Sequence, residues 1–309
     1  MCTALSLKTK DTYFGRNLDY DFSYGEEVAI VPKDHPLTFR NGKCLKQHFA
    51  IMGIAHVDNN YPLYYDAINE KGLGIAGLNF VGNASYHKKS KTKTNVASFE
   101  LIPYILAKAK NVKEASALIK EIEVTDEPYS ERFPPNALHW LISDKEESIV
   151  LEVQEDGTHI YPNPYGVLTN NPPFPEQLSS LNIYQGLSSK DREDTLTKGL
   201  DKKKFYSRGL GTLGLPGDLT SSSRFVRAVF GRFHSVSPTD ELSSIHQYFH
   251  IMGSVEQVRG LCEVKENEYE YTIYTSCYNL SKGLCYLKTY YGDIEKPISF
   301  DSKEHWLKD

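Results

Sequence analysis

Hydrophobic and polar residues alternate near the amino end of the chain in a pattern that predicts paired strands. Residues 3–7 alternate small or apolar side chains with polar ones, residues 8–11 are polar, and residues 12–16 begin a second strand-like run. Alternation with a period of two is typical of a half-buried strand, and a short polar interruption between two such runs predicts a hairpin. We therefore expect Cys2 to lie at the end of a sheet strand.

The rest of the chain divides into blocks of strands and blocks of helices. Apolar residues recur every 3.6 positions or so over 112–122, and Ser98 is a candidate N-cap for a helix over 99–108. Such blocks favour an α+β architecture of layers over a doubly wound parallel sheet. The other expected strands are 28–31, 49–54, 63–67, 74–79, 138–143, 148–153, 158–161, 269–278 and 284–291, and the other expected helices are 224–232 and 240–252.

No linker or internal repeat divides the chain, so we expect one domain over residues 1–309. Residues from about 172 to 206 are polar, irregular and rich in Ser, Lys and Asp. This segment is typical of a long excursion from the domain, either a surface loop or an arm that reaches a neighbouring subunit.

Composition and charge exclude several classes of function. The 309 residues are 40% hydrophobic and 24% charged, with no apolar run long enough to span a bilayer. A net charge of −5 gives no basic surface for nucleic acid. No Cys/His cluster has the spacing of zinc ligands, so we expect no zinc site. With no export signal and an odd count of five cysteines, we expect reduced thiols and a cytoplasmic location.

Cys2 carries the strongest chemical signal in the sequence. Initiator Met is removed when a small residue follows it, and Cys is small enough. Removal of Met1 would leave a thiol and a free α-amine on one residue. An α-amine titrates near neutral pH, so its neutral form can accept the thiol proton and act as the base for that nucleophile. Taken alone, however, Cys2 is equally compatible with an irrelevant, frayed terminus.

Polar clusters follow several predicted strands, and each has a structural explanation of its own. Arg16 and Asp19 would form an ordinary surface pair, and Asn79 and Asn170 are plausible turn residues. Ser residues at 221–223, just before Arg224, are typical of a helix N-cap.

Together and in this order, the clusters resemble the choloylglycine hydrolase family of N-terminal-nucleophile hydrolases. The resemblance covers nearly the whole chain and is carried by MCTA, FGRNLDY, YYDAINEKGLGIAGLNF, LHWLISD, GVLTNNP, GLPGDLTSSSRFVR and EYTIYTSCYNL. It implies the four-layer αββα sandwich of the Ntn hydrolases, in agreement with the α+β blocks.

The resemblance also implies a role for six residues. Cys2 matches the nucleophile, and Asp19 matches the residue that holds its α-amine. Arg16 and Arg224 match the positive charges that stabilise the thiolate. The Asn170 side chain and the Asn79 backbone N–H match the donors of the oxyanion hole. The implied reaction is hydrolysis of the amide bond of bile salts conjugated to glycine or taurine, with acyl transfer to an amine as a side activity. The resemblance implies that this reaction needs no metal or organic cofactor.

The substrate contacts rest on weaker signals. Leu18, Phe22 and Tyr24 follow Arg16, and Phe133 lies in a second aromatic loop, so all four are candidates for the walls of an apolar cleft. Ordinary core packing explains them equally well. Arg208 is a candidate partner for an anionic leaving group, which predicts a preference for taurine conjugates.

Other interpretations remain open. Penicillin V acylase would use the same machinery on a smaller acyl group, although Asn79 favours bile salts because many such acylases carry Tyr there. A papain-type Cys–His hydrolase fits less well, since none of the ten histidines lies in a recognisable motif. Outside enzymes, the chain would be a steroid- or lipid-binding protein on the same fold. Relatives commonly assemble as homotetramers, for which the segment at 172–206 is a candidate arm.

Overall fold

A computed structural model describes residues 1–196, 208–236 and 239–307. Its first sheet has six strands, and each neighbouring pair is antiparallel. The predicted amino-terminal hairpin forms its centre, with Cys2 as the first residue of β1. In spatial order the strands are β14 (Val167–Leu168), β1 (Cys2–Lys8), β2 (Thr12–Tyr20), β17 (Tyr271–Asn279), β18 (Leu284–Thr289) and β19 (Ile298–Ser299).

The second sheet has seven strands, again antiparallel throughout. Its order is β13 (Gly157–Pro162), β12 (Ser148–Gln154), β11 (Leu138–Ser143), β8 (Gly74–Asn79), β7 (Tyr61–Asn69), β6 (Ile51–Asp58) and β3 (Glu27–Val31). Among the described residues, three short strand pairs lie outside the main sheets: β4 (Leu37–Thr38) with β5 (Cys44–Leu45), β9 (Thr94–Ala97) with β10 (Ile122–Thr125), and β15 (Glu263–Lys265) with β16 (Glu268–Tyr269).

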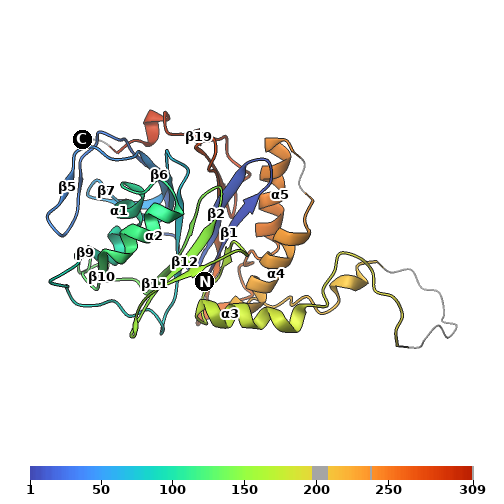
Figure 1. Cartoon of the computed structure of the whole chain (residues 1–309). Coiled ribbons are helices and arrows are strands. Elements are labelled where there is room, and N and C mark those ends of the chain that lie inside the picture. Colours follow the sequence, from blue (N-terminus) through green and yellow to red (C-terminus); the bar gives the residue numbers. More distant parts are fainter. Residues whose placement is uncertain (197–207, 237–238, 308–309) are drawn as a thin grey trace.

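Helices cover the outer faces of the two stacked sheets (Figure 1). The helices α4 (Ser221–His234) and α5 (Glu241–Gly253) pack on the six-stranded sheet, while α1 (Leu101–Leu106) packs on the seven-stranded sheet beside α2 (Val112–Lys120). Strands β1 and β2 face β7 and β8 across the interior. The result is the expected four-layer αββα sandwich. Short 3-10 turns are η1 (Ser98–Glu100), η2 (Leu181–Tyr184), η3 (Leu210–Thr212) and η4 (Lys303–His305).

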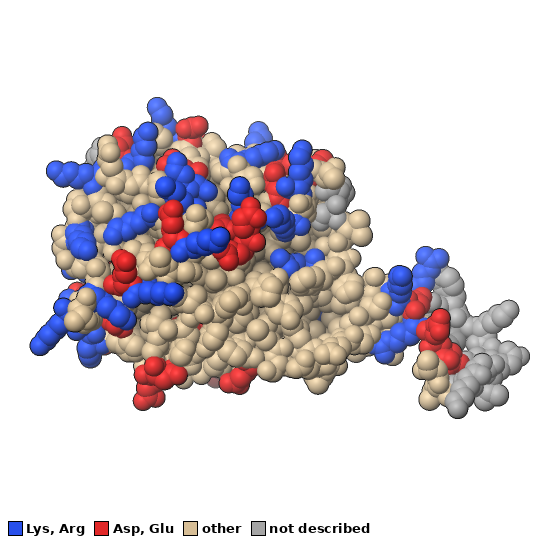
Figure 2. Space-filling model, viewed as in Figure 1, with Lys and Arg blue, Asp and Glu red and all other residues tan. Residues whose placement is uncertain are grey.

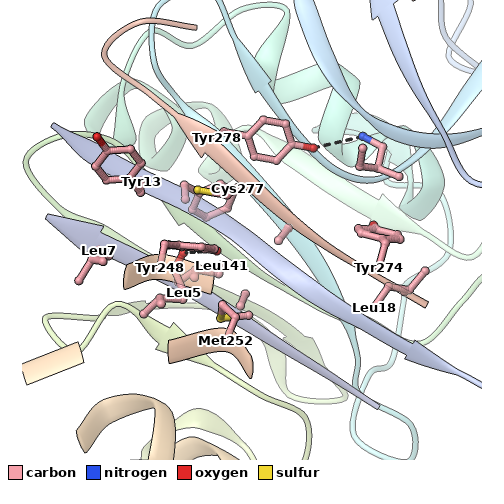
Figure 3. Close-up of a cluster of buried hydrophobic side chains, with 14 of the residues drawn as sticks. Leu5, Leu7, Tyr13, Leu18, Leu141, Tyr248, Met252, Tyr274, Cys277 and Tyr278 are labelled. Carbon is pink, nitrogen blue, oxygen red and sulfur yellow. Dashed lines mark hydrogen bonds between the residues drawn. The ribbon is translucent and has the colours of Figure 1, made fainter. Parts of the chain in front are cut away.

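Two apolar clusters hold the layers together. One fills the space around the six-stranded sheet and reaches α4 and α5, and the other lies between the seven-stranded sheet and α1 and α2. Figure 3 shows Leu5 of β1 close to Tyr248 and Met252 of α5 in the first cluster. Burial of one large apolar side chain stabilises a fold by about 1.5–3 kcal/mol, so the alternating strand residues define which face points inward.

Glycine permits one close approach that the site requires. A Cβ atom on Gly15 would lie 2.2 Å from the carbonyl oxygen of Ser276, so only glycine lets β2 lie this close to β17. The next residue, Arg16, is thereby held against the same strand, where its backbone N–H donates to Ser276 Oγ at 3.1 Å.

Three expectations about helices were wrong. Ser98 does not cap the first helix, because the chain there forms η1 and the Glu100 carboxylate receives the Ala97 N–H. The helix expected to run to residue 122 ends at Lys120, since Ile122 begins β10. The segment at 172–206 is not irregular throughout: α3 (Phe174–Ser180) and η2 form within it, and part of the rest lies outside the described residues.

Charged side chains of both signs are interspersed over the upper part of the face in Figure 2, while much of its lower part carries few of them. This face therefore has no broad region of a single sign. No helix among the described residues is long and apolar enough to cross a membrane.

Candidate active site

Cys2 and Arg16 meet in the interior between the two sheets. Cys2 is only 2% exposed, and it pairs with Leu18 across the β1–β2 hairpin. Because alternate residues share a face of a strand, Leu18 and Arg16 point to the same side as Cys2. The guanidinium of Arg16 donates to Cys2 Sγ and to the carbonyl oxygen of Gly77 in the opposite sheet. Burial opposes the charge of Arg16, but acidic groups around it outweigh burial and raise its pKa.

Arg224 approaches Cys2 from the helix side. It lies in the first turn of α4, whose N-cap hydroxyl on Thr220 accepts from the Ser223 N–H. The Arg224 guanidinium donates to the carbonyl oxygen of Cys2, to Thr3 Oγ1 at 2.7 Å and to Asn170 Oδ1 at 2.7 Å. The positive charge therefore lies beside the backbone of the nucleophile, whereas Arg16 contacts the sulfur.

Asn170 and Asn79 form one side of the site. Asn170 Oδ1 accepts from the Cys2 nitrogen at 2.8 Å, and its amide nitrogen donates to the carbonyl oxygen of Asn79 at 2.8 Å. The side-chain amide of Asn170 has a second hydrogen besides the one donated to Asn79. The backbone N–H of Phe80 donates to the carbonyl oxygen of Ala137. Because successive backbone N–H groups of a strand point to opposite edges, the N–H of Asn79 points to the edge beside β7. There the β7–β8 pairing has already ended, at Ala76.

Asp19 and the chain terminus form the opposite side. Asp19 is fully buried, and its Oδ1 accepts from Thr272 Oγ1 at 2.6 Å, while its Oδ2 has no hydrogen-bond partner among the described residues. Burial raises the pKa of Asp19, although Arg224 and the terminal ammonium oppose the rise. The Met1 ammonium contacts the backbone oxygen of Asp19 at 2.9 Å and the carboxylate of Glu270 at 2.6 Å.

The structure thus brings the six residues singled out from the sequence together around Cys2: Arg16 contacts its sulfur, Arg224 and Asn170 contact its backbone, Asn79 contacts Asn170, and Asp19 lines the same cavity. The amine that contacts Asp19 here belongs to Met1, and it contacts the backbone oxygen of Asp19. With Met1 in place, the Cys2 nitrogen is a peptide amide and cannot act as a base.

Cys2, Arg16, Asp19 and Asn79 line a cavity of about 460 Å³. A volume of this size suits a small organic ligand. Many of the other lining residues are aromatic or apolar, namely Leu18, Tyr20, Tyr24, Leu63, Tyr64, Tyr65, Phe99, Ile102, Tyr129, Phe133, Pro134, Leu138 and Trp140. The rest of the lining is formed by Glu26, His56, Gly77, Ser98, Arg132 and Asn136.

Three of the five predicted substrate contacts line this cavity, namely Leu18, Tyr24 and Phe133. Phe22 does not: it is 47% exposed, and its ring packs on the ring of Tyr24 at 4.6 Å between centroids. Arg208 is exposed and does not line the cavity either. Within one chain, Arg208 is therefore not part of the cavity that Cys2 lines.

Sequence reasoning missed much of the cavity wall. Tyr64, Tyr65, Phe99, Ile102 and Trp140 all line it. Each lies within or beside an apolar strand or helix, where an aromatic residue predicts core packing as readily as a ligand contact. Periodicity therefore carried no signal that separates the two uses.

The described residues contain no group of three or more His, Cys, Asp or Glu side chains arranged to hold a metal ion. The five cysteines are all free thiols. The arrangement around Cys2 supplies a nucleophile, positive charge and hydrogen-bond donors from the chain itself.

Comparison with known proteins agrees with this geometry. The family model of the linear amide C–N hydrolases, choloylglycine hydrolase family, matches residues 2–304. The chain is 50% identical over 290 residues to the bile salt hydrolase/transferase of Lactiplantibacillus plantarum, covering 94% of this chain and 89% of that protein. It is 36% identical over 295 residues to the bile salt hydrolase/transferase of Clostridium perfringens, with coverage of 94% and 89%.

Solved structures give the same result. The C2A variant of the Clostridium perfringens conjugated bile acid hydrolase superposes with a TM-score of 0.88 at 35% identity, covering 97% of this chain and 92% of that one. Penicillin V acylase from Agrobacterium tumefaciens shares the fold, with a TM-score of 0.74 at 19% identity and coverage of 95% and 84%. The family predicted from the sequence motifs is confirmed: the chain belongs to the choloylglycine hydrolase family of linear amide C–N hydrolases.

Proposed function

We propose that this protein hydrolyses the amide bond of bile acids conjugated to glycine or taurine, with Cys2 as the nucleophile. One observation carries the proposal: Cys2, whose sulfur is contacted by Arg16, lines a cavity that many aromatic side chains also line. A rigid apolar acyl group fits against the aromatic side chains, and its amide carbonyl then reaches Cys2. The names of the relatives from Lactiplantibacillus plantarum and Clostridium perfringens support the same substrate class.

The reaction begins once Met1 has been removed and Cys2 carries a free α-amine. The neutral amine takes the thiol proton, and the thiolate attacks the amide carbonyl carbon. The negative charge that develops on the carbonyl oxygen is stabilised by the free N–H of the Asn170 side chain and the backbone N–H of Asn79. The α-ammonium then donates its proton to the departing nitrogen of glycine or taurine.

Water releases the acyl group from the thioester by the reverse set of proton transfers. An amine that takes the place of water gives a new amide, so we also propose an acyltransferase side activity. The steps draw on residues of the chain alone, and we propose that no metal or organic cofactor takes part.

We propose further that the enzyme is a cytoplasmic homotetramer in which the segment at about 172–206 acts as the arm. Arg208 follows this segment in the sequence and does not line the cavity of its own chain. Its proposed preference for the sulfonate of taurine therefore requires that Arg208 reaches the cavity of a neighbouring subunit. Arg208→Gly should lower the ratio of taurine to glycine release, and an unchanged ratio would refute this role.

The test of the main proposal is release of free glycine and taurine from a panel of conjugated bile salts, with penicillin V alongside and Cys2→Ala as the control. Fast release that depends on Cys2 is the expected result. Turnover of penicillin V with little bile-salt cleavage would instead assign the chain to the acylase branch. Absence of both activities, in protein shown by intact mass to lack Met1, would favour a steroid- or lipid-binding protein on the same fold.

A further inference from the structure

Glu270 is a buried carboxylate that the mechanism above does not use. It lies between β16 and β17, is 7% exposed, and donates its backbone N–H to the carbonyl oxygen of Cys262 at 2.8 Å. Its Oε2 is 2.6 Å from the Met1 ammonium. Its Oε1 is buried and has no hydrogen-bond partner within the described parts of the chain. A buried carboxylate with spare acceptor capacity is costly unless a cation faces it.

The amine of the processed chain must lie close to this carboxylate. Successive backbone nitrogens are at most about 3.7 Å apart, so the Cys2 nitrogen lies within about 6 Å of Glu270 Oε2. Asp19 also has a buried oxygen, Oδ2, without a partner among the described residues. Both carboxylates interact electrostatically with the terminal ammonium of Met1, so both lie near the place where an ammonium appears when Met1 is removed. Over a distance of about 6 Å, Glu270 acts on that ammonium directly or through one bridging water.

We propose that Glu270 is a positioning residue that holds the α-amine of processed Cys2 and sets the pH at which this amine becomes a neutral base. The inference rests on the proposed function, because it concerns the base of that reaction. Asp19 holds the amine from β2, and Glu270 holds it from the start of β17, so that the lone pair is directed toward the thiol.

Several charged groups share this region and bear on the pH dependence. Burial raises the pKa of Glu270, although the chain-terminal ammonium opposes the rise, so a cation at this position favours its ionised form. The groups that interact with the amine or Glu270 from the surrounding elements are Asp19 and Tyr20 of β2, Arg224 of α4, and Cys262 in the loop after α5. Arg16 of β2 acts on Asp19.

The sign of the expected effect follows from the charge. A nearby carboxylate favours the ammonium form, so the Glu270→Gln variant should make the amine lose its proton at lower pH. The acid limb of the kcat/KM profile should therefore move to lower pH by about one unit. At a given pH on that limb, the ratio of kcat/KM to its plateau value should be about tenfold higher in Glu270→Gln than in the wild type.

The experiment compares Glu270→Gln with Glu268→Gln, a matched change two residues away. Glu268 is exposed and forms a surface ion pair with Lys265 at 3.2 Å, so its variant should keep the wild-type profile. Intact mass confirms that each protein lacks Met1. A variant that retains Met1 is produced instead with a leader that a site-specific protease cuts directly before Cys2.

Two readouts separate this inference from the proposed function. The first is the pH profile of kcat/KM for a conjugated bile salt, and the second is the pH profile of Cys2 alkylation by iodoacetamide, which needs no substrate. A shift in both profiles supports the inference. A shift in alkylation alone, with no bile-salt cleavage by the wild type, supports it while refuting the proposed function. If the Glu270→Gln profiles lie at the same pH as those of Glu268→Gln, the inference is overturned, even if the rate is lower by the same factor at every pH.

Discussion

The hydroxyl of Tyr278 forms hydrogen bonds between the two sheets, and its removal tests how much these bonds stabilise the fold. Tyr278 lies on β17 and donates to Asp66 Oδ2, on β7 of the opposite sheet, at 2.7 Å. The same hydroxyl accepts from the backbone N–H of Ile54 at 3.2 Å (Figure 3). Burial raises the pKa of Tyr278 well above its ordinary value, so the group remains a donor at any working pH. Tyr278→Phe removes this hydroxyl and leaves the ring in place.

The cost can be estimated from the two contacts. A hydrogen bond to a charged group contributes about 1.5–3 kcal/mol, and a buried backbone N–H left without a partner costs about 1–3 kcal/mol. Asp66 keeps two further hydroxyl donors, Tyr274 at 2.5 Å and Ser276 at 2.7 Å, and these offset part of the loss. We expect Tyr278→Phe to lower the free energy of unfolding by about 2–4 kcal/mol.

Tyr61→Phe is the matched control, because Tyr61 is a tyrosine whose buried hydroxyl has no hydrogen-bond partner in the part of the chain that the structure describes. Removal of that hydroxyl should leave stability unchanged or raise it slightly. The assay is urea unfolding followed by the fluorescence of Trp140 and Trp306, at one protein concentration because assembly changes apparent stability. If Tyr278→Phe is no less stable than Tyr61→Phe, the hydroxyl network around Asp66 does not hold the sheets together.

Two further predictions concern Asn170 and Asp218. Asn170→Ala removes one proposed oxyanion donor and the acceptor for the Cys2 nitrogen. The kcat for bile-salt hydrolysis should therefore fall by about 10²–10³. A fall of less than about tenfold, in protein that lacks Met1, would refute the proposed role of Asn170. Hydrogen bonds from Ser223 and Thr220 lower the pKa of Asp218 to about 2, so its contribution to stability is present above about pH 4 and is lost as the pH falls through about 2. Asp218→Asn should therefore lower the free energy of unfolding at pH 7 by less than about 1 kcal/mol, and the difference from wild type in a pH series of thermal unfolding should vanish near pH 2.

The sequence predicts elements well where one periodicity dominates. The alternation at 3–7 and 12–16 predicted the hairpin of β1 and β2, and the bounds of β8 agree with the expected strand at 74–79. It failed at Ser98, because residues 98–100 form the 3-10 turn η1, with Ala97 at its N-cap position, and the Glu100 carboxylate accepts from the Ala97 N–H. It also failed within 172–206, because α3 packs its few buried residues on α4, a contact that composition does not reveal.

The candidate site was predictable only in part, for a related reason. Cys2, Arg16 and Asp19 lie close in sequence, and ordered motifs identified Asn79, Asn170 and Arg224 through a family resemblance. Glu270 begins the motif EYTIYTSCYNL, but that motif gave it no role, because its partner is the amino terminus, far away in the sequence, and its neighbours are typical of an ordinary strand. Long-range pairing of this kind is set by sheet topology, which local patterns do not encode.

The layers of the sandwich and the site depend on each other. Arg16 of the six-stranded sheet donates to Gly77 of the seven-stranded sheet, and Asn170, beyond the end of β14, donates to Asn79 of β8. Asp66 of the seven-stranded sheet accepts hydroxyl hydrogen bonds from β17 in return. A small slide of one sheet over the other would therefore displace the positive charge at Cys2 and the oxyanion donors together. Because a misplacement of about 1 Å can lower a rate by 10² or so, the contacts that hold the sheets in register also protect the geometry needed for catalysis.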